Sequence, residues 1–439
     1  MKGYKVPVVI ILIILMLAGW VNLLIFGMNR SESLYIKTVS EAKDYYERGL
    51  YQLSAAKYED ALKYKETKDT RNQLLVSYAA QYAQDEKAYP DYLFAAQAAA
   101  LKYPTEVAYL NTITDLYIGD GKYVQAYAYL DDAIKMGIDD ESISRKYIEV
   151  KYSYQLKTKE FADFRMCSDS RFLVSDGSAW SIIDNKGYIV NNNIYSYISP
   201  PNPDGLMMYV DKSGAKLIDK DEVVQGLFSA SLESAGFCSE DLISIRENGS
   251  NSYYSIRGDK LFGDYEEAGT FTNGLAAVKI DGKWGIIDSE GSYVIDPVYE
   301  DIKLDPQGKY VCNYSALAKV DGQYHLYDSK WNVINNFSCD DMDIPTEDGV
   351  FAFSSDGKWG FADTKGNVVV EPVYDQAKSF SNGLAAVCKD GLWGFIDKEG
   401  NTVIAFQFLD AGYFNSKGGC MVRTSPESWK LLHLNIIDD

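Results

Sequence analysis

The sequence predicts a multidomain α plus β protein: a transmembrane helix, then a solenoid of α-helical hairpins, then an all-β repeat domain that is propeller-like or an open β-solenoid. Three observations predict it. An uncharged apolar run fills residues 6–27, a stretch rich in Ala, Tyr and Leu follows with helical spacing, and a Trp-Gly-centred unit recurs through the remainder. We expect a tail and anchor at 1–30, helical repeats at 31–165 and β repeats at 166–439.

The apolar run contains 22 residues without a charge, from Val6 to Gly27, and fifteen of them are Val, Ile, Leu or Phe. About 20 apolar residues span a bilayer as a helix. A cleaved signal peptide would have a shorter apolar core followed by a small-residue cleavage site, and no such site follows here. The sequence therefore predicts a single-pass membrane protein that contacts the membrane through residues 6–27. The short N-terminal tail predicts the N-terminus inside and the C-terminal domains extracytoplasmic, although positive charges on the two sides nearly balance.

The helical stretch has a repeating plan of helix, glycine turn and second helix. Gly49 and Gly121 mark the turns, and small residues recur in the second helix at Ala61, Ala99 and Ala133, which are 38 and 34 residues apart. That spacing is near the ~34-residue period of helix-turn-helix solenoids. A further helix after residues 139–140 is expected to cap the stack.

This stretch resembles tetratricopeptide repeats in the spacing Ser54-Tyr58-Ala61, although the usual first-helix Trp and the Leu-Gly pair are missing. The resemblance implies either a concave groove for a peptide or partner helix, or a stalk that spaces the β domain from the membrane.

The β half consists of about eight diverged copies of one unit. Each clear copy has three β runs, with an Asp-Gly turn after the first, Trp-Gly in the second, and Asp-x-x-Gly before the third. Weaker copies centre on Trp180, Met207, Tyr253, Tyr324 and Trp429. We assign a structural role to the signature residues Trp284, Gly285, Asp288, Gly291, Tyr299, Trp359, Gly360, Asp363, Gly366, Tyr374, Trp393, Gly394, Asp397 and Gly400.

These motifs closely resemble the WG-repeat (KWG-repeat) proteins, most clearly in the copies at Trp284, Trp359 and Trp393. The resemblance implies a bacterial protein, often associated with the cell envelope, and no enzymatic activity. Three short strands per ~35 residues suit a β-propeller, which would shield its strand edges by closing, or an open β-solenoid. We favour the propeller, and the uneven spacing of the early copies keeps the open form as the alternative.

Composition and motifs limit the possible chemistry. Lys and Arg total 43 against 63 Asp and Glu, a net charge of −20, so nucleic acid is excluded as a partner. The six cysteines form no CxxC pair and are expected to be buried thiols, although one or two disulfides stay open. His325 and His433 fall in strand-like runs, and no phosphate loop, metal motif or nucleophile motif is present. The sequence therefore predicts no cofactor, no metal and no catalytic residue.

The favoured hypothesis is a membrane-anchored, non-enzymatic interaction scaffold that binds a protein or peptide partner through its repeats. One alternative is a surface protein that binds cell-wall glycan, motivated by 35 Tyr and 7 Trp. The second is a cryptic hydrolase using a carboxylate pair, which frequent acidic residues leave open. The Trp-Gly positions are expected to belong to the core, so recognition is expected where the copies differ.

Overall fold

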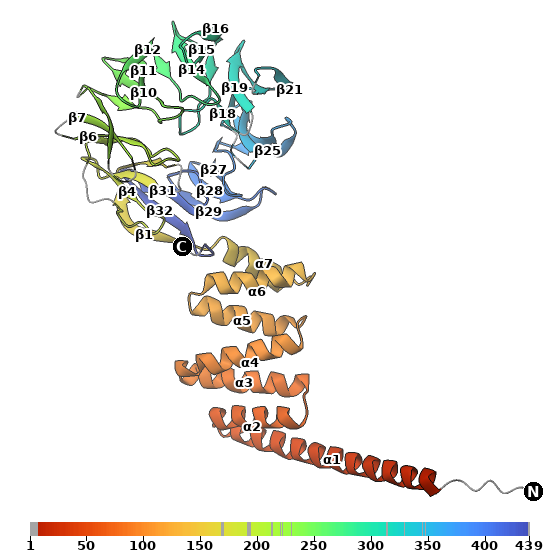
Figure 1. Cartoon of the computed structure of the whole chain (residues 1–439). Coiled ribbons are helices and arrows are strands. Elements are labelled where there is room, and N and C mark those ends of the chain that lie inside the picture. Colours follow the sequence, from red (N-terminus) through yellow and green to blue (C-terminus); the bar gives the residue numbers. More distant parts are fainter. Residues whose placement is uncertain are drawn as a thin grey trace, which may run out of the picture. The chain divides into compact units, whose positions relative to one another are not determined.

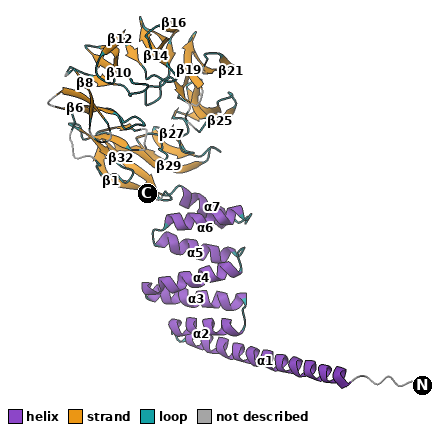
Figure 2. Cartoon of the chain, in the orientation of Figure 1, coloured by secondary structure: helices purple, strands orange, loops and turns teal. Residues whose placement is uncertain are grey.

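The computed structural model of the chain describes residues 8–167, 171–190, 195–211, 214–219, 221, 223–229, 231–312, 315–328, 330–344, 346 and 348–437, but not the side chains of residues 8–15, 22–27, 29, 211, 312, 335 and 336. The chain divides into two compact units, Met1–Val150 and Lys151–Asp439. Helices form the first unit and strands the second (Figure 2). Each unit is described by itself below.

The helical unit stacks its helices in chain order (Figure 1). They are α1 (Val8–Glu47), α2 (Tyr51–Tyr64), α3 (Lys68–Gln84), a 3-10 helix (Glu86–Ala88), α4 (Tyr89–Lys102), α5 (Val107–Gly119), α6 (Tyr123–Lys135) and α7 (Glu141–Lys151).

The predicted hairpin turns are present at Gly49 and Gly121, whose φ values of 73° and 71° lie in the region that favours glycine. The recurring small residues Ala61, Ala99 and Ala133 are fully buried. Small side chains at these positions let neighbouring helices approach closely, which explains why the pattern repeats. The N-terminal helical region predicted from the sequence is therefore confirmed.

The structure does not confirm the predicted membrane anchor. None of the helices formed by the described residues combines the length and the apolarity needed to cross a lipid bilayer. Residues 6 and 7 lie outside the described residues, and the rest of the apolar run is the beginning of α1, which continues unbroken to Glu47. The later part of α1 is polar and packs on α2, where Ser54 donates a hydrogen bond to the Ala42 carbonyl (2.9 Å). The structure therefore does not support the predicted transmembrane helix, the membrane contact through residues 6–27 or the single-pass location with extracytoplasmic domains.

The β unit is a propeller of eight sheets, or blades, arranged in a ring (Figure 1). Blade 1 contains β2 (Asp163–Met166), β3 (Phe172–Ser175) and β4 (Trp180–Ile183), and blade 2 contains β5 (Tyr197–Ile198), β6 (Met207–Asp211), β7 (Gly214–Ile218) and β8 (Val224–Phe228). Blade 3 contains β9 (Ser234–Ala235), β10 (Leu242–Glu247), β11 (Ser250–Ser255) and β12 (Lys260–Tyr265). Blade 4 contains β13 (Glu267–Ala268), β14 (Leu275–Ile280), β15 (Lys283–Asp288) and β16 (Tyr293–Tyr299).

The remaining blades repeat this order. Blade 5 contains β17 (Asp301–Ile302), β18 (Val311–Cys312), β19 (Ser315–Val320), β20 (Gln323–Asp328) and β21 (Val333–Cys339), and blade 6 contains β22 (Asp341–Met342), β23 (Val350–Ser355), β24 (Lys358–Asp363) and β25 (Val368–Tyr374). Blade 7 contains β26 (Gln376–Ala377), β27 (Ala385–Lys389), β28 (Leu392–Ile396) and β29 (Thr402–Phe408). Blade 8 contains β30 (Asp410–Ala411), β31 (Gly419–Ser425), β32 (Ser428–Leu434) and β1 (Tyr154–Phe161).

Blade 8 closes the ring by combining both ends of the β unit. Its last strand is β1, which pairs antiparallel with β32, for example Tyr154 opposite Leu434. The capping helix expected after residues 139–140 is α7, which ends at Lys151, and the chain then enters β1. The pairing of β1 with β32 decides between the two predicted forms: the domain is a closed propeller, and the open solenoid is excluded.

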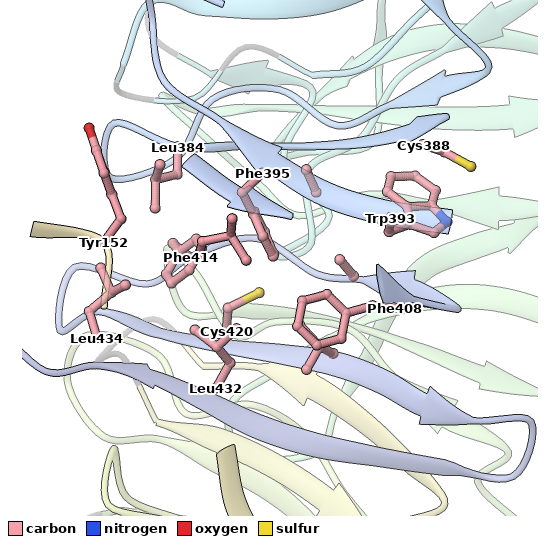
Figure 3. Packing of buried hydrophobic residues seen from close by; sticks show 14 residues of the cluster. Tyr152, Leu384, Cys388, Trp393, Phe395, Phe408, Phe414, Cys420, Leu432 and Leu434 are labelled. Atoms are coloured by element: carbon pink, nitrogen blue, oxygen red, sulfur yellow. The ribbon is translucent and has the colours of Figure 1, made fainter. Parts of the chain in front are cut away.

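Apolar clusters between neighbouring blades form the core. In the cluster of Figure 3, Trp393, Phe395 and Phe408 from blade 7 pack against Cys420 and Leu432 from blade 8. Trp393 is 6% exposed and the other four at most 2%. Each blade therefore buries one face against the next, and no blade has a complete core by itself.

Candidate functional site

The signature Trp residues occupy the same place in the equivalent strands of blades 4, 6 and 7. Trp284, Trp359 and Trp393 lie on β15, β24 and β28 and stand opposite Tyr299, Tyr374 and Phe408 of the neighbouring strand. Trp284 and Trp393 are buried, and Trp359 is half-buried. Side chains in this position contribute to packing between blades, so they offer no exposed aromatic platform for a sugar ring.

The glycine after each Trp faces an irregularity in the next strand. A Cβ atom at Gly285 would lie 2.7 Å from the Ile295 carbonyl oxygen and 2.9 Å from the Pro297 nitrogen. The register between β15 and β16 shifts beside this position, as a β-bulge requires. Gly360 and Gly394 meet the same obstruction, at 2.5 and 2.7 Å. The Trp-Gly pair is therefore explained by blade geometry.

The Asp-x-x-Gly turns are held by their own backbone. The Asp363 carboxylate accepts hydrogen bonds from the amides of Lys365 and Asn367, both at 2.9 Å. Asp288 and Asp397 make the equivalent pairs of bonds. The closing glycines, Gly291, Gly366 and Gly400, have φ values of 84°, 81° and 83°. These carboxylates stabilise tight turns, which accounts for them without a bound cation.

Many other carboxylates also serve the fold. An acidic residue at or just before the first strand of a blade accepts a hydrogen bond from the hairpin turn of the same blade: Asp340 from the Asp356 amide (2.9 Å) and Asp375 from the Asp390 amide (2.8 Å). Glu233, Glu266 and Glu300 bind Gly249, Gly282 and Gly322 in the same way. These carboxylates of the β unit therefore serve its turns and hairpins.

The first strands of the blades surround a cavity of about 510 Å³. Because its lining comes from blades 1, 2, 3, 4, 5, 7 and 8, the cavity lies in the central channel of the ring. It is lined by Phe164, Arg165, Met166, Pro200, Ala235, Gly236, Phe237, Ala268, Thr270, Leu304, Asp305, Pro306, Gln307, Gly308, Lys378, Gly412 and Tyr413. We call this space the channel cavity.

Most of the lining is apolar, and a few polar groups are fixed in place. The Tyr413 hydroxyl donates a hydrogen bond to the Asp343 carboxylate, with its oxygen 2.8 and 2.7 Å from the two carboxylate oxygens. Burial, together with the negative charge of Asp343, raises the pKa of Tyr413 well above its ordinary value. Tyr413 therefore stays protonated at neutral pH and acts as a fixed wall of the cavity.

Asp305 is the acidic group of the lining. Burial raises the pKa of its carboxyl group, and hydrogen bonds from the amides of Lys309 and Gln307, both at 2.8 Å, oppose that rise. The Thr270 hydroxyl donates to the Gln307 carbonyl (2.6 Å), which joins blade 4 to this turn. The cavity thus has a rigid polar edge on one side.

Lysines of the first strands form ion pairs across blade boundaries. Lys303 lies 2.9 Å from Asp341, and Lys378 lies 3.5 Å from Asp410 in the next blade. Lys378 also donates to the Ala411 carbonyl and packs 5.3 Å from the centre of the Trp393 ring. These lysines are engaged in joining blades.

None of the fourteen signature residues lines the channel cavity, and the sequence did not single out the residues that do. A signal was present. At one phase of the repeat, Gly236, Gly269 and Gly412 are replaced by Lys303, Asp343 and Lys378. Gly236, Gly412 and Lys378 line the cavity, so the variation between glycine and a charge at this phase indicates part of its wall.

The remaining chemically active side chains lie in strands or in the core. His325 is on β20 and His433 on β32. The prediction of buried thiols is confirmed for five free cysteines, Cys167, Cys238, Cys339, Cys388 and Cys420, whereas the side chain of Cys312 lies outside the described residues. Over the described ranges, no three His, Cys, Asp or Glu side chains gather as a metal site would require.

Comparison with known proteins identifies the repeats. The family model described as "WG containing repeat" matches residues 263–284, 284–324, 359–393 and 393–423, so the chain carries WG repeats in blades 4 to 8. No curated protein sequence matches the chain.

Solved structures that match part of the chain share little of its sequence. They include Hsv2 from Kluyvelomyces marxianus (10% identity, TM-score 0.37, 62% of this chain and 97% of that chain). They also include a eukaryotic initiation factor (13%, 0.40, 64% and 87%) and the AfRom2 CNH domain (10%, 0.31, 64% and 96%).

Proposed function

We propose that this chain is a non-enzymatic interaction scaffold that binds a protein or peptide partner, and that the channel cavity of its propeller is the binding site. The observation that carries the proposal is that shared and variable positions of the repeat have different roles. The residues common to the copies form turns, make room for the β-bulges and pack neighbouring blades together. The residues that differ between copies line the cavity, where they make each wall chemically distinct.

The size and chemistry of the cavity support a small extended ligand. Pockets that bind small ligands usually enclose about 300–1,000 Å³, with apolar walls and a few placed polar groups. The channel cavity, at about 510 Å³, has such walls in Phe164, Met166 and Phe237 and such groups in Arg165 and Gln307. It would hold a few residues of a peptide.

The helical unit offers a second candidate surface. Phe94 and Leu101 are 71% and 87% exposed on α4. Residues seven apart lie on the same face of a helix. An apolar pair at such exposure suits contact with a partner helix, as the resemblance to tetratricopeptide repeats implies. We propose it as an additional contact, secondary to the channel cavity.

A peptide display selection on the full chain tests the proposal. The decisive variant is Gln307→Trp, which fills the cavity while keeping the backbone bonds of this turn. The matched control is Gln225→Trp on the outer strand β8, where the side chain is exposed. We expect enriched peptides to bind the wild type and the control and to lose binding to Gln307→Trp. Enrichment of nothing, or equal binding to all three proteins, would overturn the proposal.

A further inference from the structure

Arg165 has an unusual setting among the charged residues of the channel. It lies on β2 and lines the cavity. Its guanidinium group packs 4.6 Å from the ring centre of Trp180 and 5.5 Å from that of Tyr197. Trp180 belongs to blade 1 and Tyr197 to blade 2, so the cation is held where two blades meet. Arginine stacks well on aromatic faces because its charge is planar and weakly hydrated.

The second of these rings is itself fixed. The Tyr197 hydroxyl donates to the Ala235 carbonyl (2.6 Å) and accepts from the Ala235 amide (2.9 Å) in blade 3. Both functions of the hydroxyl are therefore used, and the ring has a defined position. Arg165 is consequently oriented by residues from three blades before any ligand arrives, which lowers the entropy cost of binding.

The charge of Arg165 is not balanced in the way that the neighbouring charges are. Lys303 and Lys378 are paired with Asp341 and Asp410. No carboxylate among the residues that the structure describes forms an ion pair with Arg165. Cation–π contacts with Trp180 and Tyr197 do not use up the N–H groups, which can still donate hydrogen bonds to a ligand. The cavity thus presents a cation without an ion-pair partner among the described residues, and this cation suits a planar anion. The acidic group of the same lining, Asp305, accepts hydrogen bonds from the amides of Gln307 and Lys309.

We propose that the channel cavity binds the C-terminus of a peptide that ends in an apolar residue, with Arg165 bonding to the terminal carboxylate. This inference rests on the proposed function and specifies its ligand. Arginine and carboxylate match as a two-pronged pair. The apolar lining, including Phe164, Phe237 and Leu304, accepts the last side chain.

A chain end fits this site better than an acidic side chain within a chain. An internal Asp or Glu would bring peptide groups on both sides of it into a mostly apolar space, where unpaired polar groups are costly. A terminus brings one flanking peptide group. The side-chain amide of Gln307 forms no hydrogen bond with the described residues and lines the same cavity, so it can pair with that group.

The test uses the full chain and pooled N-acetylated tetrapeptides that end in Leu, Ile, Val or Phe and lack Asp and Glu. One pool has free carboxyl ends, and an otherwise identical pool has amidated ends. Affinity selection followed by mass spectrometry measures retention of each peptide. We expect the acid form of the best peptides to bind at least about tenfold more tightly than the amide, the scale of a charged hydrogen bond.

Variants assign that preference to a residue. Arg165→Met keeps the length of the side chain and removes the charge, and we expect it to reduce the acid-to-amide ratio to about one, the value for two forms bound without a charged hydrogen bond. Arg257→Met removes an exposed arginine in the turn between β11 and β12 and is expected to preserve the ratio. Unfolding transitions of both variants verify that they fold. If Arg165→Met folds and retains the preference, the assignment is wrong.

The outcomes separate this inference from the proposed function. If acid and amide forms bind equally and Gln307→Trp blocks both, the scaffold function stands and the carboxylate inference falls. A third pool, amidated and containing Asp or Glu, tests side-chain carboxylates. Binding of that pool as tight as the free acids would overturn the choice of a chain end. Retention of no peptide from any pool would overturn the proposed function as well.

Discussion

At the scale of single residues, the β unit uses its most recognisable positions for geometry. Gly360 has room for a hydrogen and nothing larger, because the bulge of the next strand approaches it. Trp359 beside it is half-buried against a neighbouring blade. Cavity-lining residues such as Arg165 stand at positions that vary between the copies, so the shared Trp-Gly signature does not identify them.

Gly360→Ala is therefore expected to destabilise the β unit. The added Cβ would lie 2.5 Å from the Val370 carbonyl oxygen and 2.7 Å from the Pro372 nitrogen, both of which belong to the backbone. Overpacking of this kind costs about 1–3 kcal/mol, which denaturant unfolding would measure. Gly119→Ala serves as the control, because a Cβ there meets nothing within 4 Å. Equal stability of Gly360→Ala and the wild type would refute the explanation given for Trp-Gly.

At the scale of elements, blades 3 to 7 each link the start of the first strand to their own hairpin through a carboxylate. Asp375 accepts hydrogen bonds from Lys358 (2.7 Å) and from the Asp390 amide (2.8 Å). These two donors, the lysine first, lower the pKa of Asp375 below its ordinary value. A carboxyl group whose pKa is lower in the folded state than in the unfolded state stabilises the fold above the unfolded pKa, and this contribution is lost as the pH falls through the folded pKa.

This linkage predicts how Asp375→Asn depends on pH. The variant is expected to have a lower denaturant midpoint than the wild type at pH 7, and the difference is expected to shrink as the pH falls below about 4, near the ordinary pKa of aspartate. Because the carboxylate is partly exposed, the effect at pH 7 should be modest. Asp296→Asn, an exposed position on β16, is the control and should match the wild type at both pH values. A pH-independent difference for Asp375→Asn would rule out the linkage.

At the scale of the whole β unit, stability depends on closing a ring with strands from its two ends. β1 begins at Tyr154 and pairs with β32, which ends at Leu434. Such long-range pairing has a large entropy cost but removes two free sheet edges. The ring also creates the channel cavity, because seven blades contribute to its wall.

Leu156→Pro tests this closure. Leu156 pairs with Leu432, and proline removes a backbone donor and fits poorly in a strand. We expect hydrogen exchange to accelerate in both blade 8 and blade 1, because the variant weakens the strand that joins them. The matched control is Val369→Pro on β25, also the last strand of a blade, where faster exchange should stay within blade 6. Acceleration confined to β1 alone would show that closure contributes little.

The sequence by itself determined the periodic features: the helical hairpins, about eight β units, the Asp-Gly turns and the Trp-Gly phase. These depend on short-range rules, namely helical spacing, alternation in strands and glycine at positive φ, so they can be recognised within some 35 residues. The membrane anchor that the sequence predicted is not supported, because no helix of the described residues combines the length and apolarity needed to cross a bilayer.

Only the tertiary structure decided closure and the site. Whether β1 joins blade 8 depends on a pairing about 280 residues apart, for which no local rule exists. The channel cavity is likewise assembled from single residues of seven blades. Arg165 becomes a candidate anchor only when the tertiary structure brings the ring centres of Trp180 and Tyr197 within 4.6 and 5.5 Å of its guanidinium and no described carboxylate pairs with it. Repetition encodes the scaffold locally, whereas the site arises from differences between repeats that only the closed ring brings together.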